Sequence, residues 1–189
     1  MKAIVTGSSG FVGAALVESL RKDGHRVVTL VRDEETTGAD AVFWHPLRGV
    51  PDTSALEGTR AVFHLAGENI ANGRWTADRK IRIKDSRVIG TRTLSATLSR
   101  LESPPEVMVC ASAVAIYGVN SDDVVSEGSS FGEDWLAQVC VEWESASGPA
   151  NDAGIRVVFM RMGVVLHPSG GMMKRVLLPF RLGLGGRLG

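Results

Sequence analysis

Apolar residues follow two alternating patterns along this chain: short continuous runs, and longer stretches with helical spacing. The continuous runs predict strands at residues 2–6, 26–31, 41–44, 60–65, 106–112 and 155–161. Between the first two runs, Val12, Leu16 and Leu20 repeat at helical spacing until Gly24 ends the helix. Apolar strands that alternate with helices are typical of a parallel sheet covered on both faces. The pattern therefore predicts an α/β fold with a Rossmann-type, doubly wound parallel sheet.

Three further helices are expected after residue 75. The first begins at a Thr76 cap and stops at Ser103-Pro104-Pro105. The second runs from about Gly132 to Ser147, and a third, apolar one covers residues 172–181. The apolar face of the first helix is predicted to consist of Ile81, Val88, Leu94, Leu98 and Leu101.

The first strand runs directly into a glycine-rich turn, Gly7-Ser8-Ser9-Gly10-Phe11-Val12-Gly13. The first N–H groups of a helix and its positive dipole end attract a pyrophosphate, and glycines allow the backbone to approach it. Three glycines at GxxGxxG spacing also occur in ordinary turns. Their position between the first strand and the first helix nevertheless favours a dinucleotide-binding site.

The residues after the second strand bear on which cofactor is bound. An acidic residue at this place usually accepts from the ribose 2′-hydroxyl of NAD, whereas an arginine favours the 2′-phosphate of NADP. Here Val31 is followed by Arg32 and then by Asp33. We therefore favour NADP over NAD. Asp33 is the competing interpretation, and a solvated strand end is the alternative for Arg32.

Composition excludes several classes of protein. The chain has 189 residues, 44% of them hydrophobic, and equal numbers of basic and acidic residues, 21 of each. We see no basic stripe that would bind nucleic acid and no apolar run long enough to span a membrane. No signal peptide is evident. Cys110 and Cys140 are too few for a disulfide framework or a zinc site, so we expect no metal and a cytoplasmic location.

Several segments occur in an order that resembles one protein family. They are TGSSGFVG, HLAGENI at 64–70, Arg74-Trp75, the SRVIGTR run at 86–92, SAVAIYG at 112–118 and RMGVVL at 161–166. Together they resemble the extended short-chain dehydrogenase/reductases. The GENI and SRxxGTR segments are similar to an atypical, sugar-nucleotide epimerase-like branch that also carries an older cell-division-inhibitor label. The resemblance covers essentially the whole chain.

The resemblance implies a cofactor that lies across the carboxyl ends of the strands. Its expected contacts are Gly7, Ser9, Gly10, Phe11, Val12 and Gly13 at the pyrophosphate, Val31 and Arg32 at the adenosine, Leu65, Ala66 and Gly67 in the crevice, and Arg87 and Val165. For Arg87, a salt bridge on its own helix is an equal alternative. Val165 is expected near the nicotinamide.

The expected catalytic pair of the wider superfamily is missing. There, a tyrosine exchanges a proton with the substrate hydroxyl, and a lysine one helical turn later assists it. The matching helix, residues 134–144, contains neither residue type. Alignment on Glu144 places Leu136 and Cys140 at the two positions.

Ser112 and Tyr117 are the candidates to replace this pair. Ser112 ends a strand within one position of the superfamily's serine or threonine, where it would hydrogen-bond the substrate or the nicotinamide amide. Tyr117, the single tyrosine of the chain, would be a slow base without a lysine partner. We expect Cys140 and His64 to be core residues rather than catalytic groups.

The resemblance implies an NADP-binding oxidoreductase or epimerase acting on a nucleotide sugar or a similar hydroxylated small molecule. The missing Tyr-Lys pair leaves the alternative of a non-catalytic NADP(H)-binding sensor or regulatory module. We expect residues 1–166 to form the cofactor-binding domain and residues 167–189 to begin a truncated substrate-binding region. The apolar residues Met172, Leu177, Leu178 and Phe180 would then be exposed, which favours a homo-oligomer as one way to cover them.

Overall fold

A computed structural model describes the chain except for residues 51, 119–123, 169 and 187–189. The strands are β1 (Lys2–Thr6), β2 (Arg26–Val31), β3 (Ala41–Phe43), β4 (Ala61–His64), β5 (Val107–Ala113), β6 (Arg156–Met162) and β7 (Leu166–His167). The helices are α1 (Phe11–Lys22), α2 (Ala77–Leu98), α3 (Trp135–Ser145), α4 (Gly148–Asp152) and α5 (Gly171–Arg181). Short 3₁₀ turns lie at η1 (Glu34–Thr36), η2 (Ser54–Leu56) and η3 (Val114–Tyr117).

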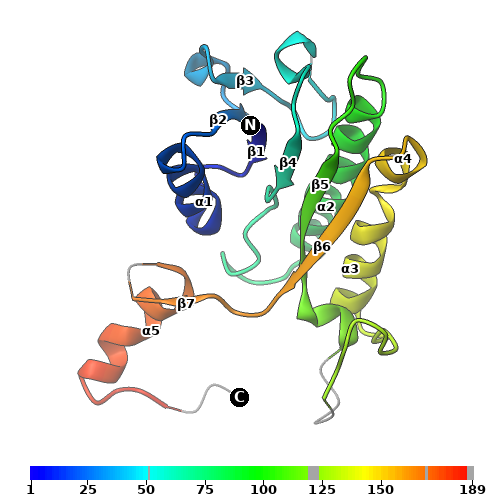
Figure 1. Cartoon of the computed structure of the whole chain (residues 1–189). Helices are drawn as coiled ribbons and strands as arrows, with labels where there is room; N and C mark the ends of the chain where they lie inside the picture. Colours follow the sequence, from blue (N-terminus) through cyan, green and yellow to red (C-terminus); the bar gives the residue numbers. More distant parts are fainter. Residues whose placement is uncertain (51, 119–123, 169, 187–189) are drawn as a thin grey trace.

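Six strands form one parallel sheet in the order β3-β2-β1-β4-β5-β6. All six predicted strands are confirmed, with ends that agree to within one residue. The chain runs outward from β1 to β3, returns to β4 beside β1, and then continues to β6 (Figure 1). The direction of winding thus reverses between β1 and β4. In open sheets of this kind, ligands bind in the crevice outside the carboxyl ends of the strands at that reversal.

Helices cover the two faces of the sheet unequally. Ala3 and Val5 of β1 pack with Val17 of α1, whereas the intervening Ile4 packs with Leu94 of α2 on the opposite face. Figure 1 shows α1 on one side of the sheet and α2 and α3 on the other. A fully buried side chain of this size contributes about 1.5–3 kcal/mol to folding, so β1 is stabilised from both faces. The predicted doubly wound sheet is confirmed.

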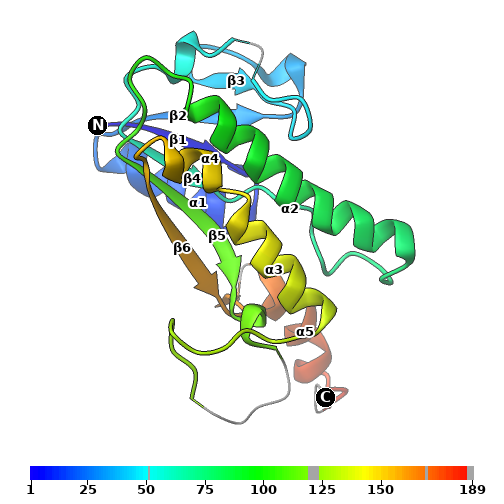
Figure 2. The ribbon, with the colours of Figure 1, turned by 90° about the vertical axis from the view of Figure 1, so that its right-hand side faces the viewer.

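The predicted apolar face of α2 was partly wrong. Ile81 is 57% exposed, whereas Ile83, Leu94 and Leu98 are fully buried. Ile81 lies about 200° around the helix from Ile83 and so faces away from the buried side of α2, whose first turns extend past the ends of the strands (Figure 2). The helix also ends at Leu98, five residues before the predicted stop.

The predicted helix from Gly132 to Ser147 is shorter than expected. The Asp134 carboxylate accepts the N–H groups of Leu136 and Ala137 and so fixes the start of α3 at Trp135. The helix ends at Ser145, and the separate turn of α4 follows with Pro149 in its first turn.

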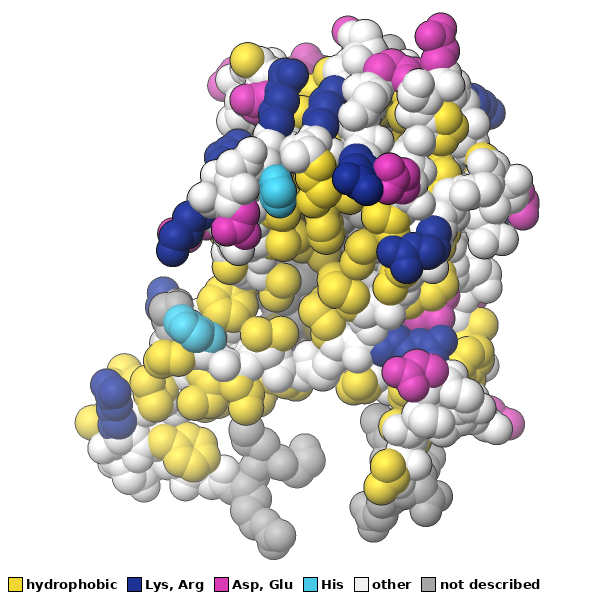
Figure 3. Space-filling model, viewed as in Figure 1, with side chains coloured by type: hydrophobic (Ala, Val, Ile, Leu, Met, Phe, Trp, Pro, Cys, Tyr) yellow, Lys and Arg dark blue, Asp and Glu magenta, His cyan; other side chains and the backbone are white. Residues whose placement is uncertain are grey.

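Hydrophobic side chains gather between α1 and β6 on the α1 side of the sheet (Figure 3). They include partly buried residues of β5 and β6, because α1 is the helix that Figure 1 shows on this face among the described residues. On α5, Met172, Leu178 and Phe180 are exposed as predicted, whereas Leu177 is partly buried.

No helix in the described part of the chain is long and apolar enough to cross a membrane.

Candidate functional site

The glycine turn between β1 and α1 leaves no room for side chains at two positions, Gly7 and Gly13. Gly7 has a φ of +67°, and a Cβ there would lie 2.8 Å from the carbonyl carbon and oxygen of Leu65. A Cβ on Gly13 would overlap the carbonyl oxygen of Gly7. The N–H of Gly10 donates to that carbonyl oxygen at 2.9 Å and closes the turn. At Gly7 and Gly13 the turn can therefore offer only its backbone to a ligand.

The N-terminus of α1 also fits an anionic ligand. Gly10 occupies the N-cap position and has no side chain that could cap the helix, and the first turn contains no acidic residue. The first N–H groups of an α-helix lack partners within the helix, and the positive end of the helix dipole attracts a phosphate. The turn thus passes the steric and the electrostatic test for a dinucleotide pyrophosphate.

The end of β2 lies beside this turn and presents Arg32. Val31 is the last residue of β2 and is partly buried, whereas the Arg32 side chain is exposed. Arg32 forms no ion pair with any described residue. Asp33, the competing residue, accepts the Glu35 N–H at 3.0 Å and caps the following turn. One oxygen of Asp33 is thus engaged in local structure, while the guanidinium of Arg32 is available.

Leu65, Ala66 and Gly67 follow β4 directly, at the point where the winding of the sheet reverses. The amides of Leu65 and Ala66 both donate to Thr6 Oγ1 at 3.1 Å. Gly67 is exposed, and a Cβ there would lie 3.3 Å from Cζ of Arg87. The structure brings these predicted residues next to the glycine turn, because Gly7 contacts Leu65.

Arg87 reaches this crevice from α2. Its Nη1 donates to the carbonyl oxygens of Glu68, at 3.1 Å, and Ile83, at 3.0 Å. Its Cζ lies 5.1 Å from the centre of the Trp143 ring. Burial lowers the pKa of Arg87, with smaller opposing effects from Cys140 and Glu68. Among the described residues no carboxylate lies within ion-pair distance of Arg87, so the salt bridge that was its alternative role is not formed.

Phe11 directs its side chain away from the turn. Its ring lies 5.9 Å from that of His167, centre to centre, and fills the space that a Cβ on Gly170 would need. Ser9 and Val12 lie within the turn, Ser9 exposed and Val12 partly buried. Val165 is 42% exposed just beyond β6.

The two predicted catalytic residues are joined by a partly buried ion pair that the sequence did not reveal. Arg161 of β6 donates to Glu144 of α3 through Nε, at 2.9 Å, and Nη2, at 2.8 Å. Ser112 Oγ donates to Glu144 Oε1 at 2.6 Å, and Arg161 Nη1 donates to Tyr117 Oη at 2.7 Å. The side chains of Arg161 and Glu144 are only 17% and 11% exposed. The hydrogen bond to Glu144 is the main cause that raises the pKa of Arg161.

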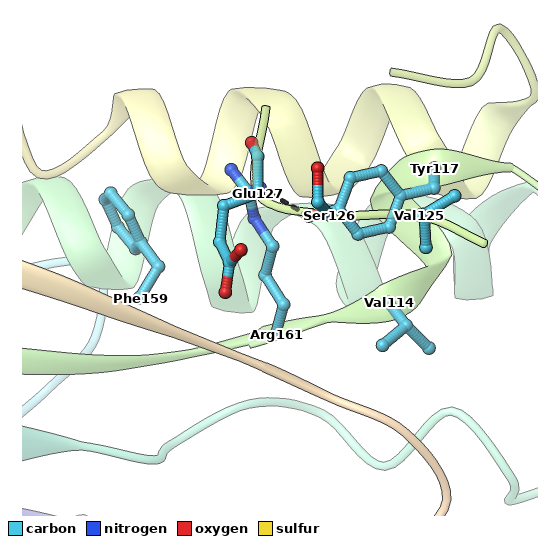
Figure 4. A pocket seen from close by; sticks show the side chains of 7 residues that line it. All are labelled: Val114, Tyr117, Val125, Ser126, Glu127, Phe159 and Arg161. Atoms are coloured by element: carbon cyan, nitrogen blue, oxygen red, sulfur yellow. Dashed lines mark hydrogen bonds between the residues drawn. The ribbon is translucent and has the colours of Figure 1, made fainter. Parts of the chain in front are cut away.

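A pocket of about 410 Å³ opens beside this ion pair (Figure 4). Its lining residues are Val114, Tyr117, Val125, Ser126, Glu127, Phe159 and Arg161. Arg161 Nη1 also donates to the Glu127 carbonyl oxygen at 3.3 Å, which ties the loop to β6. With four donors already engaged, Arg161 serves as a wall of the pocket rather than as a free cation. The pocket lies at the carboxyl ends of β5 and β6, where the reacting half of a ligand would be expected.

The helix α3 supplies no proton-transfer group of the usual kind. Leu136 is apolar, and Cys140 is 2% exposed, as expected for a core residue. Burial is the main cause that raises the pKa of Cys140 to about 11, so its thiol stays protonated at neutral pH. Within the described residues, no group of three or more His, Cys, Asp and Glu side chains is placed to hold a metal ion.

The comparisons with known proteins agree with this geometry. The model of the NAD dependent epimerase/dehydratase family matches residues 3–176. The chain therefore belongs to this family, and the epimerase-like assignment made from the sequence motifs is confirmed.

Particular relatives are longer proteins. The epimerase family protein MT2273 of Mycobacterium tuberculosis is 43% identical over 185 residues, which cover 98% of this chain and 60% of the relative. The human epimerase family protein SDR39U1 (isoform 2), whose crystal structure contains NADPH, is 34% identical with a TM-score of 0.84. That match covers 98% of this chain and 61% of the human one.

A structure of the nucleoside-diphosphate sugar epimerase from Corynebacterium glutamicum is also similar. The two sequences are 37% identical and the TM-score is 0.85. The match covers all of this chain and 39% of the Corynebacterium chain. The chain thus spans about 60% of the length of the curated relatives it matches.

Proposed function

We propose that this chain is the NADP-binding part of an epimerase or oxidoreductase that acts on a nucleotide sugar or a similar hydroxylated small molecule. The observation that carries the proposal is the glycine turn, where Gly7 and Gly13 leave no room for side chains and the N-terminus of α1 has no side-chain cap. Residues 1–166 would form the cofactor domain, and residues 167–189 would begin the substrate-binding region.

Each end of the cofactor has residues of matching chemistry. The turn from Gly7 to Gly13 would hold the pyrophosphate, and Arg32 would pair with the adenosine 2′-phosphate. The partly buried cation of Arg87 lies between Gly67 and the Trp143 ring, and would donate to oxygens of the nicotinamide half. The relative that binds NADPH supports NADP as the choice of cofactor.

The reacting half would rely on the Ser112 and Tyr117 hydroxyls. When bound, the nicotinamide supplies hydride transfer at its C4 atom. Ser112 donates its own proton to Glu144, so its oxygen would accept a hydrogen bond from a substrate hydroxyl or from the nicotinamide amide. Arg161 holds Tyr117 at the pocket wall and would orient its phenol.

Binding and turnover are tested separately. Calorimetric titration should give NADPH at least about tenfold tighter binding than NADH, because only NADPH carries the phosphate that Arg32 would contact. Equal affinities would contradict the NADP assignment, and no binding of either would overturn the proposal. Turnover is tested with the full-length protein, UDP-glucose as a representative nucleotide sugar, and chromatography of the products.

A second candidate function is a binding module that senses NADP(H) without turnover. The observation that favours it is the reacting half itself, where Ser112 and Tyr117 are both hydrogen-bonded to an ion pair and α3 offers neither tyrosine nor lysine. Tight NADPH binding without product formation from any nucleotide sugar would support this function.

A further inference from the structure

The chain contains a buried histidine that the proposed chemistry does not use. His64 is the last residue of β4 and pairs in register with Thr6, the last residue of β1. Both residues are fully buried at the reversal point of the sheet. Their side chains meet, with Thr6 Oγ1 2.8 Å from His64 Nδ1. On its other side, His64 Nε2 lies 3.0 Å from Thr91 Oγ1 of α2.

The hydrogen bonds around Thr6 fix the tautomer of this histidine. A hydroxyl oxygen has one proton to donate and two lone pairs that accept. The amides of Leu65 and Ala66 occupy both lone pairs of Thr6 Oγ1. The Thr6 proton must therefore go to His64 Nδ1, which leaves Nε2 with the ring proton and makes it the donor to Thr91.

A continuous chain of hydrogen bonds results. Trp143 Nε1 of α3 also donates to Thr91 Oγ1, at 2.9 Å. The chain thus runs from α3 through α2 and β4 to Thr6, and ends at the two amides that follow β4. Burial lowers the pKa of His64 to about 4, so the ring is neutral near pH 7, as this pattern requires.

The end of this chain touches the glycine turn. A Cβ on Gly7 would lie 2.8 Å from the backbone of Leu65 and 2.9 Å from the nitrogen of Ala66. The two backbones are in contact, so a shift of residues 65–66 would move the turn. The direction of the Thr6 hydroxyl holds these amides in place, and the Nδ1 acceptor of His64 sets that direction.

We propose that His64 is a positioning residue of the cofactor crevice, acting through Thr6 on the backbone of Leu65 and Ala66. The proposal rests on the proposed cofactor binding. It assigns the effect on the crevice to the Nδ1 side of the ring, whereas the Nε2 side joins β4 to α2 and contributes to stability alone.

Two substitutions separate these two sides of the ring. His64→Asn keeps an acceptor close to the position of Nδ1 and loses the link to Thr91. His64→Gln keeps a donor close to the position of Nε2 and loses the acceptor for Thr6. We expect the glutamine variant to bind NADP⁺ about tenfold more weakly, and the asparagine variant to stay within about twofold of the unaltered chain. Thr91→Val is the matched control, and should lower the unfolding temperature without changing affinity.

A second readout needs no cofactor. Hydrogen exchange of the Leu65 and Ala66 amides should accelerate at least about tenfold in His64→Gln relative to His64→Asn, because the first loses the bond that orients Thr6. If the histidine variants do not fold, Thr6→Val compared with Thr6→Ser tests the link through which His64 would act, and equal exchange in these two variants would overturn the proposal.

Equal losses of affinity or equal exchange in both histidine variants would overturn the proposal, because a general packing role affects both alike. If the unaltered chain binds neither NADP⁺ nor NAD⁺, the proposed function fails, and the exchange experiment still decides whether His64 acts through Thr6.

Discussion

The two halves of the sheet differ in the chemical groups that lie at their carboxyl ends. On β1, β2 and β4, the crevice is built from glycine backbone, the end of a helix and two amides held by Thr6, with the Arg32 cation free beside them. On β5 and β6, the polar side chains bind one another instead, around the ion pair between Arg161 and Glu144. The first half is arranged for binding. In the second half, the side chains of Ser112, Tyr117, Glu144 and Arg161 are hydrogen-bonded to one another, and the expected helix positions hold Leu136 and Cys140.

The two halves should therefore respond differently to substitution. A backbone crevice depends on the absence of side chains, so single added atoms should abolish its function. A network of charged side chains depends on pairing, so removal of one partner should weaken the fold while the opposite half keeps its shape.

The largest effect is expected from Gly13→Ala. The added methyl group would overlap the Gly7 carbonyl oxygen and push the turn open. We expect NADPH affinity to fall more than about a hundredfold, measured by calorimetry. Gly38→Ala is the matched control, because a Cβ there meets nothing within 4 Å. Unchanged affinity in the Gly13 variant would contradict the role of the turn.

Removal of one partner of the ion pair should affect stability in the other half. Glu144→Ala leaves the Arg161 cation largely buried without its carboxylate, and should lower the free energy of unfolding by about 3 kcal/mol in chemical denaturation. Glu142→Ala, which removes an exposed pair with Lys84 from the same helix, should cost less than about 1 kcal/mol. Affinity for 2′,5′-ADP, which lacks the nicotinamide, should stay unchanged in both variants. A loss of that affinity would show that the halves are not independent.

Acid should destabilise the binding half through His64. Burial lowers the pKa of His64 from 6.5 to about 4. Between these two values, His64 binds a proton in the unfolded chain but stays neutral in the folded chain. This contribution to stability is present above pH 6.5 and is lost as the pH falls toward 4, at a total of about 3 kcal/mol. The free energy of unfolding, measured by denaturation across this pH range, should change less steeply with pH in His64→Asn, by the equivalent of one proton. An identical slope in both proteins would contradict the assignment.

The smallest effect is expected from Arg32→Ala. Loss of a charge-assisted hydrogen bond should weaken NADPH binding by about 1–3 kcal/mol and leave NADH binding almost unchanged. Arg26→Ala, an exposed arginine at the other end of β2, is the control. If both cofactors lose affinity equally, Arg32 does not recognise the 2′-phosphate.

The sequence predicted the parts of the molecule that depend on local order. The strands, the glycine turn and the exposed Arg32 are set by short runs of adjacent residues, and they were found where expected. The face of α2 was less predictable, because an exposed isoleucine, Ile81, and a buried one, Ile83, lie two residues apart and so point to nearly opposite sides of the helix. The ion pair between Glu144 and Arg161 depends on two elements meeting in space. Its only signal was a carboxylate and an arginine in otherwise apolar segments.

Two buried thiols lie in the half of the protein that contains β5, β6 and α3. Cys110 lies in β5 and Cys140 in α3, and both are free, with burial as the main cause that raises their pKa values to about 12 and about 11. An alkylating reagent needs an accessible thiolate, so it can modify these residues only during moments when the helices that cover them, α2 over Cys110 and α3 around Cys140, separate from the sheet. The rate of alkylation therefore measures how often this half of the protein opens.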